Sequence, residues 1–89
     1  MSVISGSVQV LDPIGLHARP ASQIVKLVKE SEIEVQIGRE GEDYAKANSA
    51  LRLMALQIKP GETLMVEVET DDADLAKQII DQIQDFLKG

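Results

Sequence analysis

The stretch VQVLDPIGLHARPASQIVKLVKE (residues 8–30) holds a strand pattern, a turn pattern and a helix pattern in immediate succession. Polar and apolar side chains alternate over residues 7–11, which is typical of a strand with one buried face. Pro13 and Gly15 then fit the second and fourth places of a type I turn. Apolar residues at helical spacing predict a helix that begins at residue 17 or 18 and runs to about residue 30.

Along the rest of the chain, segments with strand-like alternation are interspersed with segments that have helical spacing. Alternating side chains predict strands at residues 33–37, 44–47 and 64–68. Helical spacing predicts one helix within residues 48–58, capped by Asn48 or Ser49 and ended by Pro60 and Gly61, and another within residues 70–87, with cap candidates at 70–72. The predicted order is therefore βαββαβα.

The strands alternate rather than being apolar on both faces. One face of the sheet should therefore meet water while helices cover the other. This favours an α+β open-faced sandwich: a four-stranded, mainly antiparallel sheet with three helices on one face. At 89 residues the chain has room for a single domain, residues 1–89, and little room for a large internal cavity.

Composition excludes several classes of function. A net charge of −6 disfavours binding to nucleic acid or to anionic membranes, which needs a basic surface. With no cysteine and one histidine, the chain offers no disulfide and no ordinary zinc or iron–sulfur site, and we expect no cofactor and no metal. The N-terminal residues do not resemble a secretory signal, and no apolar run is long enough to span a membrane. We expect a soluble, cytoplasmic, monomeric protein.

The single histidine, His17, stands at the predicted start of the first helix. Unpaired backbone N–H groups and the positive end of the helix dipole meet there, which favours a neutral imidazole and attracts anions. Arg19 adds a guanidinium suited to phosphate oxygens. Gly15 allows close approach of the backbone, and Pro20 suits a first helical turn. These residues indicate a nucleophile that accepts a phosphoryl group, although a surface or capping histidine is the commoner use of such a position.

The residues GLHARPA (15–21) closely resemble the active-site signature of HPr, the histidine-containing phosphocarrier family of the bacterial phosphoenolpyruvate-dependent sugar phosphotransferase system. The resemblance continues through KANSALRLMALQIKPGETLMVEVE (residues 46–69), and the length and element order agree over the whole chain.

This resemblance implies that enzyme I phosphorylates His17 on Nδ1, with phosphate from phosphoenolpyruvate. The phosphoryl group would pass to an A-type acceptor domain of a sugar permease. Arg19 would stabilise it, and the backbone amides of Ala18 and Arg19 would lie near its oxygens. The protein would be an intermediate in phosphotransfer rather than a stand-alone turnover enzyme. The sequence also resembles the nitrogen-branch relative of HPr, whose acceptor is regulatory, so the downstream partner stays open.

The family's docking surface includes the second helix, which here would contribute Ala50, Leu51, Arg52, Met54 and Ala55. Helical spacing alone leaves open whether Leu51 and Met54 belong to that surface or to the core, whereas Leu53 and Leu56 are expected in the core.

Ser49 aligns with the serine that HPr kinase phosphorylates in some members of the family. Its simpler role is a helix cap. Phosphate there would add negative charge beside the docking surface without unfolding the helix. The regulated proteins commonly carry glycine where Arg52 and Gln57 stand here, and this difference counts against recognition by the kinase.

Two other classes of function remain as alternatives. One is a regulatory interaction module that does not transfer phosphate, which would make His17 dispensable. The other is a hydrolase using Ser22, for which no activated nucleophile is visible. The acids at Asp71, Asp72 and Asp74 are better explained as helix-start charges than as a metal site.

Overall fold

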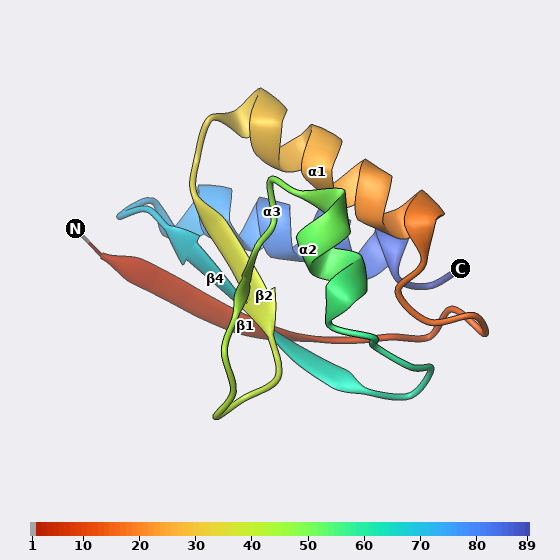
Figure 1. Ribbon diagram of the computed structural model, residues 1–89. Helices are drawn as coiled ribbons and strands as arrows, with labels where there is room; N and C mark the ends of the chain where they lie inside the picture. Colours follow the sequence, from red (N-terminus) through yellow and green to blue (C-terminus); the bar gives the residue numbers. More distant parts are fainter. Residues whose placement is uncertain (1) are drawn as a thin grey trace.

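Four strands and three helices alternate in the computed structural model, which describes residues 2–89. Their order is β1 (Val3–Gln9), α1 (Ala18–Ser31), β2 (Val35–Gly38), β3 (Ala45–Lys46), α2 (Ala50–Ala55), β4 (Thr63–Glu69) and α3 (Ala73–Phe86). The strands lie in the order β1-β4-β2-β3, with every pairing antiparallel. All three helices lie on one side of the sheet (Figure 1). The predicted open-faced α+β sandwich is confirmed.

Strand β4 is one of the two inner strands of the sheet and pairs with both β1 and β2. Its residues Leu64, Val66 and Val68 are fully buried beneath the helices, while the side chains between them lie on the open face. Gly6 of β1 lies opposite Val66, and a Cβ atom there would come within 2.9 Å of Ile80 on α3. The glycine therefore allows α3 to pack closely on β1.

Helices α1 and α3 begin where the sequence predicts. His17 is the N-cap of α1, and Asp72 is the N-cap of α3, where its carboxylate accepts a hydrogen bond from the Leu75 N–H at 3.1 Å. The buried residues of each helix recur at helical spacing: Pro20, Ala21, Ile24 and Val28 in α1, and Ala76, Ile79 and Ile83 in α3. In the part of the chain that the structure describes, no helix is both long and apolar enough to cross a bilayer.

The predicted bounds of the first strand, residues 7–11, are wrong. β1 begins at Val3, which pairs with Glu69, and ends at Gln9. The Gln84 side chain of α3 satisfies both backbone groups of Gln9, accepting from its N–H at 2.8 Å and donating to its carbonyl at 2.9 Å. The strands predicted at 33–37 and 44–47 are likewise shifted to Val35–Gly38 and shortened to Ala45–Lys46.

Helix α2 is shorter than the predicted span, because it ends at Ala55 rather than near Pro60. Ser49, one of the two predicted caps, is its N-cap, and its hydroxyl accepts the Arg52 N–H at 3.3 Å. Gln57, just past the helix, has a φ of 53°, a left-handed conformation that glycine adopts more easily. The Arg39 guanidinium donates to the carbonyls of Leu56 and Gln57, which fixes this early end.

Arg39 and Glu62 form a polar cluster in which each side chain also binds the backbone. The Arg39 Nε atom lies 2.6 Å from Glu62 Oε1, and Arg39 Nη2 lies 3.0 Å from Glu62 Oε2, which is a bidentate pair. The Lys59 N–H also donates to Oε2 at 2.6 Å. The cluster ties the end of β2 to the loop between α2 and β4. Arg39, followed by the Lys59 N–H, lowers the pKa of the Glu62 carboxyl from 4.5 to about 2.

The depressed pKa of Glu62 predicts a loss of stability in acid. Because Glu62 titrates at about 2 in the folded chain and near 4.5 when unfolded, its contribution is complete above pH 4.5 and declines as the pH falls towards 2. We expect the difference in free energy of unfolding between wild type and Glu62→Gln to shrink over that range, measured by urea titration. Glu40→Gln, on the neighbouring turn, is the control. A difference that stays constant across this range would contradict the account.

Candidate active site at the start of helix α1

The loop between β1 and α1 is held by backbone hydrogen bonds from two sides. The N–H groups of Leu11 and Asp12 both donate to the Leu87 carbonyl, at 2.9 and 2.8 Å. The Gly15 N–H donates to the Asp12 carbonyl at 3.0 Å, which confirms the predicted turn. The Leu16 N–H donates to the Ile58 carbonyl at 3.2 Å. The loop is therefore fixed against the end of α3 and against the loop that follows α2.

A substitution of Gly15 would disturb this loop strongly. Its φ is +91°, and a Cβ atom there would lie 2.5 Å from the Ile58 carbonyl oxygen. Both the backbone conformation and the contact therefore require glycine. The sequence predicted close approach of the backbone at this position. The group that approaches Gly15 is the backbone carbonyl of Ile58.

His17 caps α1 with its backbone only. The residue is extended, with φ −106° and ψ −173°, and its carbonyl accepts the Ala21 N–H at 3.1 Å. Its side chain makes no capping bond and is 30% exposed. The first N–H groups of the helix, those of Ala18 and Arg19, have no intrahelical partner. They therefore remain available to an anion beside the imidazole.

The imidazole contacts Asp12, five residues earlier. His17 Nε2 lies 3.0 Å from Asp12 Oδ2, and Asp12 Oδ1 accepts the Ile14 N–H at 2.8 Å. Within residues 2–89, Asp12 is the only charged residue that is buried, at 7% exposure. The sequence indicated only a turn residue at position 12, so this contact was not predicted. The available signal was an acid on the far side of a tight turn from the single histidine.

The environment of Asp12 favours its ionised form. The hydrogen bond from the Ile14 N–H, followed by that from His17, lowers the pKa of the Asp12 carboxyl below its usual value, and the positive charge of Arg19 acts in the same direction. An ionised carboxylate only accepts hydrogen bonds. In a neutral imidazole the ring proton therefore lies on Nε2, and Nδ1 keeps the lone pair.

Arg19 and the imidazole share a surface hollow at the junction of the loop, the start of α1 and the end of α3, which meet at one side of the molecule (Figure 1). Arg19 is exposed and makes no ion pair with any residue from 2 to 89. Its guanidinium is thus free to bind an anion in the hollow. Ser22, the candidate for a hydrolase, makes no hydrogen bond to His17 among the described residues.

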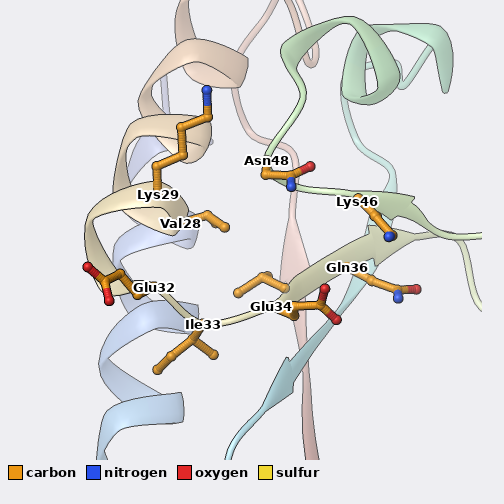
Figure 2. Close-up of a pocket in the computed structure, with 9 residues that line it drawn as sticks. Val28, Lys29, Glu32, Ile33, Glu34, Gln36, Lys46 and Asn48 are labelled. Atoms are coloured by element: carbon orange, nitrogen blue, oxygen red, sulfur yellow. The ribbon is translucent and has the colours of Figure 1, made fainter.

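A second hollow lies at the other end of α1 and has a volume of about 220 Å³ (Figure 2). Lys29 of α1 and Glu32, the residue just after α1, stand on one side of it, and Lys46 and Asn48 stand on the other. It lies at the far end of the helix from His17.

In the described part of the chain, no group of three or more acidic, histidine or cysteine side chains could hold a metal ion.

Helix α2 presents an exposed face beside a buried one. Leu51 is 78% exposed and Met54 is 36% exposed, whereas Leu53 is fully buried and Leu56 packs partly against the core. This settles the orientation that the sequence left open. Arg52 and Ala55 are also exposed, and Ala50 is half-buried. Helix α2 packs on α1, so the two helices lie next to each other on the same side of the sheet (Figure 1).

Comparisons with known proteins agree over nearly the whole chain. Residues 4–88 match a family model described as the phosphorylation site of the HPr component of the phosphotransferase system. The phosphocarrier protein HPr of Haloferax volcanii is 37% identical, over 91% of this chain and 89% of its own. The phosphocarrier protein NPr of Shewanella violacea is 34% identical, over 90% and 87%. A solved Mycoplasma histidine-containing phosphocarrier protein superposes with a TM-score of 0.77 at 32% identity, over 90% of each chain.

Replacing Gly15 tests how the loop is held. We expect Gly15→Ala to lower the free energy of unfolding by about 3 kcal/mol, because the variant meets both an unfavourable φ and a backbone contact. Gly41→Ala is the matched control, since Gly41 has a φ of +82° but a Cβ atom there would have no neighbour within 4 Å. The control should lose only about 1 kcal/mol. Equal losses in urea unfolding would show that the contact with Ile58 does not constrain the loop.

Proposed function

Because the chain belongs to the HPr family of phosphocarrier proteins, we propose that it accepts a phosphoryl group on Nδ1 of His17 from phospho-enzyme I and passes it on. One observation carries the assignment to this atom: Asp12 engages Nε2, so the lone pair of the neutral ring is on Nδ1. His17 is also the N-cap of α1. Phosphoenolpyruvate is the original source of the phosphate. This role places the protein in the cytoplasm as a monomer that binds each partner briefly.

The chemistry asks little of the protein beyond position and charge. The Nδ1 lone pair attacks phosphorus, the bond between phosphorus and the donor group of enzyme I breaks, and the donor keeps that electron pair. In the second transfer the bond between Nδ1 and phosphorus breaks in the same way. The amides of Ala18 and Arg19 and the guanidinium of Arg19 would bind the phosphoryl oxygens.

The partners would dock around His17 and on the exposed face of α2, which presents Leu51, Arg52, Met54 and Ala55 with Ala50 at its edge. An exposed leucine and methionine suit contact with more than one partner, because methionine adapts to different surfaces. We propose an A-type domain of a sugar permease as the acceptor. A regulatory acceptor of the nitrogen branch is the second candidate, and the similarity to NPr proteins as well as HPr proteins supports considering it.

Regulation at Ser49 is a separate proposal. The Ser49 hydroxyl is half-buried and serves as the cap of α2, next to exposed Leu51 and Arg52. A phosphate at a helix N-terminus is compatible with the helix, and its charge would lie beside the docking surface. HPr kinase would be the partner for that reaction.

Phosphorylation of His17 can be tested directly. We expect the protein, incubated with phosphoenolpyruvate, magnesium and enzyme I, to form one acid-labile, base-stable adduct that mass spectrometry detects. The adduct should be absent from His17→Ala and from samples without enzyme I, and an A-type acceptor domain should remove it. An adduct that persists in His17→Ala, or none with a competent enzyme I, would overturn the proposal.

The charge of Arg19 gives a second test. We expect Arg19→Glu to slow phosphoryl transfer on the order of 10²-fold, because it replaces a stabilising charge by a repulsive one. Its free energy of unfolding should stay within about 0.5 kcal/mol of wild type, since the side chain is exposed. Lys26→Glu, the same charge change further along α1, is the control in both the transfer and unfolding assays. A comparable slowing in the control would mean that overall charge, rather than Arg19, decides the rate.

A further inference from the structure

A buried carboxylate beside the proposed phosphorylation site needs an explanation. Asp12 carries negative charge, which would repel the dianion that His17 is to accept, and burying a charge costs free energy unless hydrogen bonds compensate it. Both Asp12 oxygens are engaged, Oδ1 by the Ile14 N–H and Oδ2 by His17 Nε2. The carboxylate therefore acts on the nitrogen of the ring that does not receive phosphate.

We propose that Asp12 is a positioning residue for phosphotransfer: it holds the His17 ring in the Nε2–H tautomer and stabilises the charged ring of the phosphorylated state. The proposal deepens the function proposed above and depends on it. The same logic operates wherever a carboxylate fixes the tautomer of a reacting imidazole.

The loop gives Asp12 the rigidity that this role requires. Its N–H is bound by the Leu87 carbonyl, its own carbonyl accepts the Gly15 N–H, and its side chain is bound by the Ile14 N–H. These three bonds fix both the backbone and the rotamer of Asp12. The imidazole that hydrogen-bonds to it is thereby held in one orientation, with Nδ1 directed away from the carboxylate.

The Asp12 contact also fits the charge balance of both transfer steps. When Nδ1 gives its lone pair to phosphorus, the ring keeps its Nε2 proton and becomes positively charged, and the carboxylate faces that charge. When the phosphoryl group leaves, the electron pair returns to Nδ1 and the ring is neutral again. No proton has to enter or leave the ring in either step.

An asparagine at position 12 would reverse the preference. Its single oxygen would be required by the Ile14 N–H, so its NH₂ group would face Nε2 as a donor. That arrangement favours a lone pair on Nε2 and the proton on Nδ1, the tautomer in which Nδ1 cannot attack phosphorus. Asp12→Asn changes the tautomer with almost no change in side-chain volume.

The experiment measures both the tautomer of the His17 ring and the rate of phosphoryl transfer. Protein labelled with ¹⁵N-histidine is studied by long-range ¹H–¹⁵N NMR at a pH where the ring is neutral, and transfer from enzyme I is timed. Wild type should show the Nε2–H tautomer. Asp12→Asn should shift the population towards Nδ1–H and slow transfer about 10-fold to 100-fold. Asp85→Asn is the control, because Asp85 lies in the same region but pairs with Lys88 at 3.1 Å, and it should match wild type in both measurements.

Either of two outcomes would overturn the role of Asp12. One is a wild-type ring that is Nδ1–H, and the other is an Asp12→Asn variant that keeps the wild-type tautomer and transfers at the wild-type rate. The wild-type spectrum decides the first point even if the variant does not fold. If wild type shows the Nε2–H tautomer but accepts no phosphate from a competent enzyme I, the function proposed above fails while the tautomer assignment stands.

Discussion

The carbonyl oxygen of Leu87 accepts hydrogen bonds from two consecutive N–H groups, those of Leu11 and Asp12, and the geometry of the whole site depends on this contact. It joins the end of α3 to the loop that follows β1, so two segments far apart in the sequence are held together. From there the chain turns through Gly15, which fits only because it has no Cβ, and reaches His17 at the start of α1. The backbone of His17 is thus placed by hydrogen bonds that do not involve its side chain.

Local patterns predicted the elements because their causes are local. Alternation identified β2 and β4, and helical spacing identified α1 and α3. The cap candidates, Asn48 or Ser49 and residues 70–72, indicated where α2 and α3 begin, and Ser49 and Asp72 are the caps. The end of α2 could not be predicted in this way. It depends on Arg39, which binds the carbonyls of Leu56 and Gln57 from a distant turn, and Gln57 gives no sign that it adopts a left-handed conformation.

The same distinction applies to the site. His17, Arg19 and the start of the helix followed from the sequence, because a helix start has the same electrostatics wherever it occurs. The contact with Asp12 did not, since it exists only for one conformation of the turn, fixed by Leu87 and Ile58. The sequence therefore identified the proposed nucleophile but not the carboxylate that we propose selects its reacting nitrogen.

The position of phosphate on the ring tests this account most directly. Protein labelled with ¹⁵N-histidine and phosphorylated by enzyme I should show coupling between ³¹P and Nδ1 of His17, with a proton retained on Nε2. Coupling of phosphorus to Nε2, or phosphate on any residue other than His17, would contradict the claim that Asp12 reserves Nδ1 for the phosphoryl group.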